Sequence, residues 1–239
     1  MSSKTRNKPK RRITDYNFER LTSKHIEDAK NLVAAHFSTF ANYRTTLTSS
    51  TADMIQFDAY RTENMIRQNC STGVFEKCSG KNKMVGVALG IIVEKNNTDL
   101  QKLQWYSVEA SSKELWWHPI ARFMKSLHGN DIFEAIGANR ILFQHVIAID
   151  PDHIGINMAY TLLNRSFGLA KKLNCDASAG FLTSFTIIGI AKKFNTPVLK
   201  TVDFTKYIDK ETGGNPFSKA TPPHNLFTMV YTKLTKPAL

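Results

Sequence analysis

The residues best suited to chemistry in this sequence form a short polar turn between a buried strand and a helix. Residues 141–149 are almost continuously apolar, and the polar turn 150–157 follows them directly. The segment after the turn has the apolar spacing of a helix. The first N–H groups of a helix have no partner inside it, and the positive end of its dipole faces the turn. Such a turn is suited to binding anions, phosphate groups in particular.

Two residues of this turn suit a backbone that approaches a phosphate closely. Gly155 adopts a left-handed conformation without steric cost, and Asn157 is one of the few other residue types that tolerate it. His153 also lies in the turn, and we expect it to cap the helix or contact phosphate. Taken alone, the turn predicts an anion site but does not identify the anion.

Two histidines are candidates for a general base. His145 lies in the middle of the apolar strand, and strand alternation places it on the same side as Ile147 and Ile149. His36 lies between apolar positions of the first predicted helix. Catalysis and simple core packing are both open interpretations for His145, whereas packing is the preferred interpretation for His36.

Strands and helices alternate along the chain. Strands are expected at residues 16–21, 74–77, 84–94, 141–149, 175–179, 198–204 and 226–234, and helices at 26–40, 52–68, after Pro119, 158–172 and 183–193. This order predicts an α/β fold. We expect a twisted mixed sheet of about six or seven strands, with a largely parallel centre and helices on both faces.

The positive charge is concentrated at the N-terminus. Residues 1–13 contain six Lys or Arg and no acid, which is half of the net charge of +12. Blocks of like charge repel one another, so we expect a disordered basic leader over 1–13 and a single domain over 14–239. The alternative is a nuclear-import or nucleic-acid contact. No zinc-ligand spacing or aromatic–basic pattern follows the leader, which disfavours a nucleic-acid partner.

Cysteine usage and hydropathy bear on the compartment. The three cysteines show no CxxC spacing, and an odd number argues against a disulfide framework. No apolar run approaches the ~18–20 residues of a membrane helix, and no secretory signal is visible. We therefore expect a cytoplasmic protein without a membrane partner, with nuclear entry through the basic leader as the alternative.

With these elements in place, the chain resembles the GCN5-related N-acetyltransferases, and among them the arylalkylamine (dopamine-type) branch. The resemblance covers nearly all of residues 16–234, including the first strand YNFERL, the strand VGVALGIIVEK and the ending FTKY of the sixth strand. The most specific motif is altered. Where the family has Arg-Gly-x-Gly-Ile-Ala/Gly, this chain has Ile154-Gly155-Ile156-Asn157-Met158-Ala159, so Ile154 replaces the arginine and Asn157 the second glycine.

The resemblance implies a set of contacts with acetyl-CoA, the acyl-donor cosubstrate, between strands 141–149 and 175–179. Backbone groups of Ala148 and Ile149 would hold the pantetheine arm. The N–H groups of five consecutive residues would hold the pyrophosphate: Ile154, Gly155, Ile156, Asn157 and Met158. Ser184 or Thr186 would give a proton to the departing thiolate. The acceptor would be a small arylalkylamine. The pair Trp116-Trp117 is a candidate for an aromatic amine pocket, with core packing as the commoner role of such residues.

The resemblance further implies an acidic base soon after the first helix, and this sequence has none. No Asp or Glu occurs between Ala29 and Ala52. His145 is therefore the candidate base. The sequence predicts an acetyl-CoA-dependent N-acetyltransferase of a small amine. The alternative is a catalytically weak or inactive protein that keeps the fold for binding.

Overall fold

The computed structural model describes most of the chain between Arg11 and Leu234. The described residues are 11–38, 51–77, 82–96, 122–123, 126–127, 132–183, 185–220, 222 and 225–234. Ser184 and the pair Trp116-Trp117, which were singled out above, lie outside these residues.

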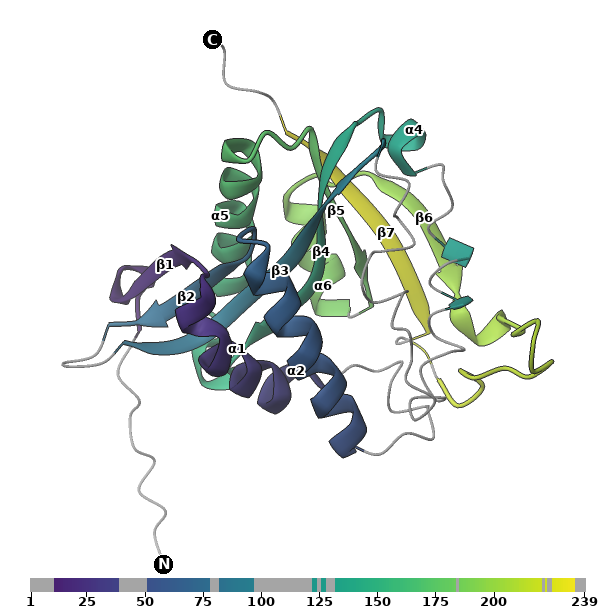
Figure 1. The fold of residues 1–239 in the computed structure, drawn as a ribbon, viewed down its shortest axis with the longest axis horizontal. Helices are drawn as coiled ribbons and strands as arrows, with labels where there is room; N and C mark the ends of the chain where they lie inside the picture. Colours follow the sequence, from purple (N-terminus) through teal and green to yellow (C-terminus); the bar gives the residue numbers. More distant parts are fainter. Residues whose placement is uncertain are drawn as a thin grey trace, which may run out of the picture.

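Seven strands form one mixed sheet in the order β1-β2-β3-β4-β5-β7-β6 (Figure 1). They are β1 (Tyr16–Arg20), β2 (Thr72–Glu76), β3 (Lys83–Glu94), β4 (Arg140–Ile149), β5 (Ala177–Leu182), β6 (Val198–Asp203) and β7 (Leu226–Lys233). Only β4 and β5 run parallel among these neighbouring pairs. The predicted mixed sheet is confirmed, but the largely parallel centre is wrong. β4 is apolar on both faces because helices cover both, and this does not require parallel neighbours.

Helices lie on both faces of the sheet, as predicted (Figure 1). α1 (Ile26–Val33) and α2 (Thr51–Arg67) share the largest core cluster with β3 and β4. α5 (Met158–Lys172) packs on the opposite face, where Met158 contacts a cluster that includes Val74. α6 (Phe185–Lys193) lies beside β5, and the short α4 (Ile132–Ile136) precedes β4. We call the two faces of the sheet the α2 side and the α5 side.

β4 contains one residue more than its neighbour β3 requires. Leu89 of β3 pairs with Val146, and the next residue, Gly90, pairs with Gln144. His145 is therefore an extra residue between the two pairs. A β-bulge of this kind bends the strand and redirects the side chains that follow it.

The bulge shifts the alternation of side chains along β4. Phe143 and Val146 both belong to the main core on the α2 side, although they are three residues apart. Ile149 packs with Met158 on the α5 side. A Cβ at Gly90 would lie 2.7 Å from the carbonyl oxygen of Phe143, so the strand opposite the bulge needs a glycine at this point.

A buried ion pair anchors the loop that follows β6. The guanidinium of Arg122 donates two hydrogen bonds to the Asp209 carboxylate, at 2.7 and 2.6 Å, and the Thr212 hydroxyl donates a third at 2.8 Å. The bonds from Arg122, supported by Thr212, outweigh the effect of burial and hold the pKa of Asp209 well below its usual range.

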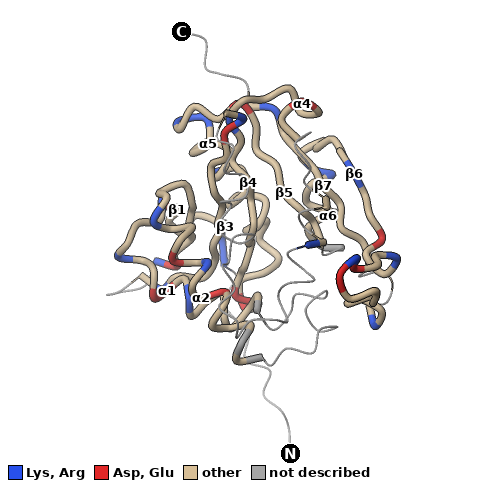
Figure 2. The backbone as a smooth tube through the Cα atoms, turned by 45° about the vertical axis from the view of Figure 1, so that its right-hand side comes forward, with Lys and Arg blue, Asp and Glu red and all other residues tan. Residues whose placement is uncertain are grey.

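Elsewhere in the described chain, Lys and Arg are spread over several separate places and do not gather on one face (Figure 2).

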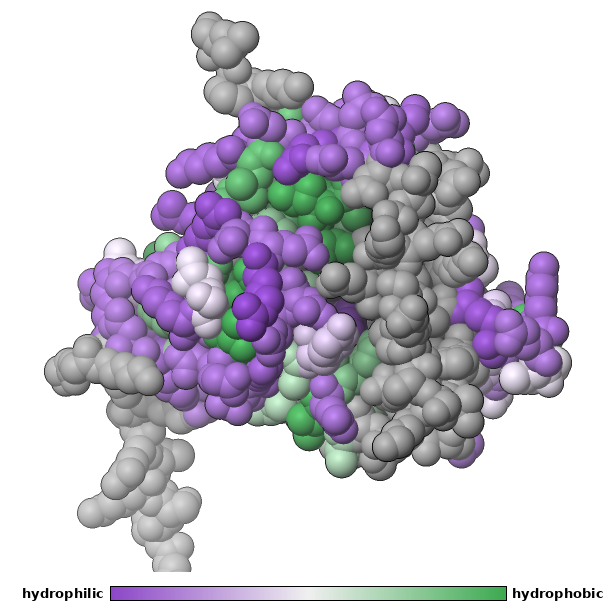
Figure 3. Space-filling model, in the orientation of Figure 1, coloured by the Kyte–Doolittle hydropathy of each residue, from purple (hydrophilic) through white to green (hydrophobic). Residues whose placement is uncertain are grey.

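The apolar spacing of the helices correctly predicted their buried faces. The buried apolar residues are Ile26, Ala29, Leu32 and Val33 in α1, and Met54, Phe57, Met65 and Ile66 in α2. The surface over β1 and α1 is largely hydrophilic (Figure 3). Within the described ranges, no helix has the length and hydropathy needed to span a bilayer.

Candidate functional site

β4 and β5 diverge beyond the bulge and open the sheet at one end. Gln144 is the last residue of β4 that pairs with β5, and β4 continues to Ile149. The N–H of Asp150 donates to the Val85 carbonyl in β3, so alternation directs the N–H of Ile149 into the opening. The side chain of Ala148 is buried in the main core. The backbone contacts expected of Ala148 and Ile149 with a pantetheine arm stay predictions.

The turn after β4 has the backbone conformation that the sequence predicted. After a 3-10 turn (Pro151–His153), Gly155 has a φ of 99° and Asn157 a φ of 58°. Asn157 is the N-cap of α5, and its side chain makes no capping hydrogen bond to the helix. A Cβ added at Gly155 would meet nothing within 4 Å. An open turn at the start of a helix fits a pyrophosphate, and the contacts of residues 154–158 with it remain predictions.

The Asp150 carboxylate fixes the beginning of this turn. It accepts hydrogen bonds from the Lys83 ammonium and from the N–H of Asp152, each at 3.0 Å. Burial by itself would raise the pKa of Asp150, but these two hydrogen bonds outweigh it and lower the pKa. The turn therefore begins at an ionised side chain that is tied to β3.

His153 does not face the anion site, and the expectation that it caps the helix or contacts phosphate is wrong. Its side chain is 2% exposed, and its Nδ1 lies 2.8 Å from the Tyr16 hydroxyl in β1. Burial, and then the positive charge of Arg11, lower the pKa of His153. The 3-10 turn directs this side chain toward β1, where its contact with Tyr16 ties the turn to that strand.

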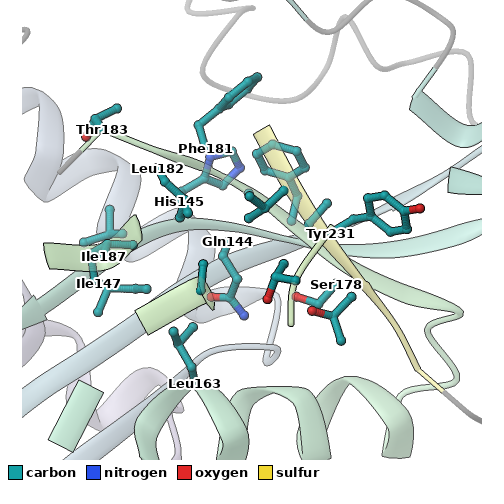
Figure 4. Close-up of a pocket in the computed structure, with 18 of the residues that line it drawn as sticks. Gln144, His145, Ile147, Leu163, Ser178, Phe181, Leu182, Thr183, Ile187 and Tyr231 are labelled. Carbon is teal, nitrogen blue, oxygen red and sulfur yellow. The ribbon is translucent and has the colours of Figure 1, made fainter. Parts of the chain in front are cut away.

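A cavity of about 270 Å³ passes through the opening and reaches both faces of the sheet (Figure 4). Its α2-side chamber is lined mainly by aromatic and histidine side chains: His36, Phe37, His145, Phe181, Phe227 and Tyr231. Its α5-side chamber is lined by apolar and uncharged polar side chains, among them Gln144, Ile147, Leu163, Ser178, Ile187 and Thr232. Two molecules that enter from opposite faces can therefore meet at the opening.

His145 lies at the bulge and belongs to the α2-side chamber. Its ring centroid is 4.9 Å from that of Phe143, and the side chain points toward Phe181 (Figure 4). The expectation that His145 shares a side with Ile147 and Ile149 is wrong, because the bulge shifts the alternation by one residue. The change turns the imidazole toward the aromatic chamber and away from α5.

The other proposed proton-transfer residues are placed unequally. His36 lies in a π-helical turn (Ala34–Ser38) that extends α1, and it lines the same cavity as His145. Ser184 is outside the described residues, and the side chain of Thr186 is not described. The structure thus brings together the two histidines that the sequence had treated separately.

Sequence reasoning missed the residues that give the α2-side chamber its character. Phe181, Phe227 and Tyr231 come from β5 and β7, and their alternating pattern is the same for a core as for a pocket wall. Arg61 of α2 also lines the cavity and pairs with Asp58 at 3.3 Å, with both side chains buried. No Asp or Glu lines the described part of the cavity. The described residues also contain no group of three side chains suited to a metal ion.

Comparisons with known proteins agree with this architecture. No protein-family model matches the sequence, and no curated protein matches it either. Among solved structures, a mosquito arylalkylamine N-acetyltransferase-like protein (like 5b) superposes with a TM-score of 0.76 at 18% identity, over 92% of this chain and 100% of that one. A Drosophila melanogaster polyamine N-acetyltransferase gives 0.75 at 14% identity, over 92% and 100% of the two chains.

A third similar structure is a condensation domain. The C-terminal condensation domain of Ebony, in complex with β-alanyl-dopamine, superposes with a TM-score of 0.71 at 14% identity, over 91% of this chain and 98% of that one. At such identities a structural match establishes the fold alone. The chain has the fold of the GCN5-related N-acetyltransferases and is structurally similar to the arylalkylamine N-acetyltransferase-like proteins of insects.

Proposed function

We propose that this chain is an acetyl-CoA-dependent N-acetyltransferase that acts on a small arylalkylamine. The observation that supports this most directly is the cavity that crosses the sheet through the β4–β5 opening. On the α5 side, the free edge of β4 and the start of α5 suit a pantetheine arm and a pyrophosphate. On the α2 side, the aromatic chamber suits the amine.

The amine has to lose a proton before it can attack. An alkylammonium has a pKa of about 10.4, so only about one molecule in a few thousand is neutral at pH 7. We assign His145 to accept this proton while the amine nitrogen forms a bond to the acyl carbon. The carbon–sulfur bond then breaks, and we assign the hydroxyl of Ser184 or Thr186 to protonate the thiolate. A positioned base typically contributes 10²- to 10⁴-fold to the rate.

The chamber walls favour an aromatic amine over a polyamine. Each ring of the wall can stabilise a second ring in an edge-to-face contact by about 0.5–1.5 kcal/mol. A polyamine would carry further ammonium groups, which are costly to bury without carboxylates. The described lining contains no carboxylate, and Arg61 in the lining is paired with Asp58.

A binding protein that keeps this fold but transfers little or no acetyl group is the second candidate. Two observations favour it. Ile154 occupies the place of the family's arginine, and its side chain is 67% exposed. An isoleucine side chain carries no charge that could pair with a pyrophosphate. The sequence between Ala29 and Ala52 has no acid to serve as the base.

Thiol release from acetyl-CoA by the full chain tests both candidates. We expect tryptamine and phenethylamine to exceed agmatine and spermidine by at least about tenfold in kcat/KM, an effect of about 1.4 kcal/mol. Thermal melts with CoA report binding independently of turnover. Protection by CoA without turnover of any amine would select the binding protein. If CoA gives no thermal protection and no amine is turned over at millimolar ligand, both candidates are refuted.

A further inference from the structure

The α5-side chamber extends further than an acetyl group requires. A pantetheine arm that lies in the opening would end near Gln144 and Gly180, because β4 and β5 are paired from there on. The chamber continues past this point to Ser178 and Thr232, which are direct cross-strand partners. Ser178 is two residues before Gly180, about 7 Å along the strand. An acetyl group has one carbon beyond its carbonyl and does not reach this depth.

The side chains at this depth face the α5 side. Ala177 and Ala179 belong to the main core on the α2 side, so the intervening Ser178 points to the other face. Figure 4 shows Ser178 and the amide of Gln144 on this face, below the strands. The extension therefore continues the donor side of the cavity and is separate from the aromatic chamber.

Two buried polar atoms along this extension, one at Gln144 where it begins and one at Thr232 further in, lack partners among the described residues. Gln144 is 9% exposed, and its amide nitrogen donates to the Ser166 hydroxyl of α5. Its amide oxygen is buried and accepts no hydrogen bond from the described residues. The buried Thr232 hydroxyl likewise has no hydrogen-bond partner among them. A buried polar atom without a partner costs about 1–3 kcal/mol, so such atoms mark a place for a polar ligand group.

A hydroxyl group has the chemistry to pair with either atom. The Gln144 oxygen can only accept a hydrogen bond, whereas the Thr232 hydroxyl can donate one, and an alcohol both donates and accepts. An ammonium group would meet no carboxylate in the described lining, so its burial is disfavoured. Leu163, Phe167 and Val230 supply apolar wall for the carbons between the carbonyl and the hydroxyl.

We propose that this extension selects the acyl group of the donor, and that it takes a short hydroxyacyl thioester of coenzyme A in preference to the unsubstituted acyl group of the same length. The proposal rests on the proposed function, because it adds donor specificity to the same transfer. The bonds that change are the same. The amine nitrogen bonds to the acyl carbon, the carbon–sulfur bond breaks, and the thiol leaves with a proton that balances the one lost by the amine.

The test compares 4-hydroxybutyryl-CoA with butyryl-CoA as donors to tryptamine. We expect the hydroxyacyl donor to have about tenfold higher kcat/KM in the parent protein, as one additional buried hydrogen bond implies. Thr232→Val keeps the side-chain shape and removes the hydroxyl, and Gln144→Met removes the amide oxygen. Each should bring the ratio of the two donors close to one.

Thr228→Val is the matched control. Thr228 is on the same strand and the same face as Thr232 and is buried. Its hydroxyl accepts a hydrogen bond from the Thr201 hydroxyl at 3.4 Å, and it is not among the residues that line the cavity. The donor ratio should be unchanged in this variant. A fall in the ratio in Thr228→Val as large as in Thr232→Val would overturn the assignment of the subsite.

Calorimetric titration of both thioesters gives a second reading that does not need turnover. The parent should bind 4-hydroxybutyryl-CoA about tenfold more tightly than butyryl-CoA. Equal kcat/KM and equal Kd for the two donors, with acetyl-CoA active, would overturn the donor proposal and leave the proposed function standing. Failure to bind or turn over any CoA thioester would overturn both. If a variant does not fold, the ratio of kcat/KM for the two donors in the parent protein still tests the donor proposal.

Discussion

Replacing Arg122 with methionine removes the cation that anchors the loop after β6, where Arg122 pairs with the buried Asp209 and, at 2.7 Å, with the exposed Glu211. The substitution keeps most of the aliphatic length and removes two charge-assisted hydrogen bonds of 2.7 and 2.6 Å to Asp209. The carboxylate keeps the 2.8 Å bond from Thr212 and a longer one, 3.4 Å, from the Tyr207 hydroxyl. A carboxylate whose side chain is fully buried thus loses its charge partner.

The expected cost follows from this environment. Breaking a buried ion pair usually costs about 3–5 kcal/mol, because one charge is left without compensation. The Arg122 side chain is 24% exposed, so water can enter the vacated space, and Thr212 preserves part of the hydrogen bonding. Both effects favour the lower end of the range, about 3 kcal/mol. For a chain of this length, the melting temperature should fall by about 6–12 °C.

Urea unfolding of the parent, Arg122→Met and Arg67→Met measures this cost. Arg67 is the matched control because its side chain is 59% exposed and its pair with Glu63 is an i,i+4 surface pair, worth about 0.3–0.5 kcal/mol. The pKa of Asp209 is lowered in the folded protein, so its contribution is complete above about pH 4 and is lost as the pH falls below that value. The difference between parent and Arg122→Met should therefore shrink in acid. Equal costs for the two arginine variants would refute the reasoning.

Three further outcomes are expected. Gly155→Val should remove the thermal protection by CoA because a φ of 99° strains a side chain by about 1–2 kcal/mol, whereas Gly168→Ala in α5 should retain it; protection in both variants would contradict the anion site. His145→Gln should lower kcat/KM by 10²- to 10⁴-fold, and a loss seen only in His36→Gln would reassign the base. Burial lowers the pKa of His153, so the unfolded chain takes up its proton first and the free energy of unfolding should fall as the pH drops below about 6.5. His153→Gln should flatten that dependence between pH 7.5 and 5.5, and an unchanged slope would count against a neutral buried imidazole.

Residue type and local spacing predicted much of the frame around the site. Gly155 and Asn157 are both left-handed, as their residue types suggested, because the turn is a local structure. The apolar segment 141–149 predicted a strand covered on both faces, and β4 lies in the middle of the sheet. Helical spacing predicted the buried faces of α1 and α2, since packing on one side of a helix leaves a periodic trace.

The chemistry inside the frame depends on contacts between distant segments. The direction of His145 follows from a bulge that is defined by pairing with Leu89 and Gly90 of β3, and alternation within β4 alone gave the opposite side. His153 turns inward because Tyr16, 137 positions earlier, offers its hydroxyl. The spacing of the aromatic residues in β5 and β7 does not distinguish a pocket wall from a core, because both have the same period.

The extra residue in β4 makes the site depend on the number of residues as well as on their identity. The bulge is a property of the backbone and of the close approach at Gly90, so a point substitution at His145 changes the chemistry and leaves the opening in place. Deletion of His145 would instead remove the bulge and restore regular alternation from Phe143 to Val146, with Val146 still on the α2 side. A single substitution can therefore change the side chains of the cavity, whereas the bulge itself changes only when a residue is inserted or deleted.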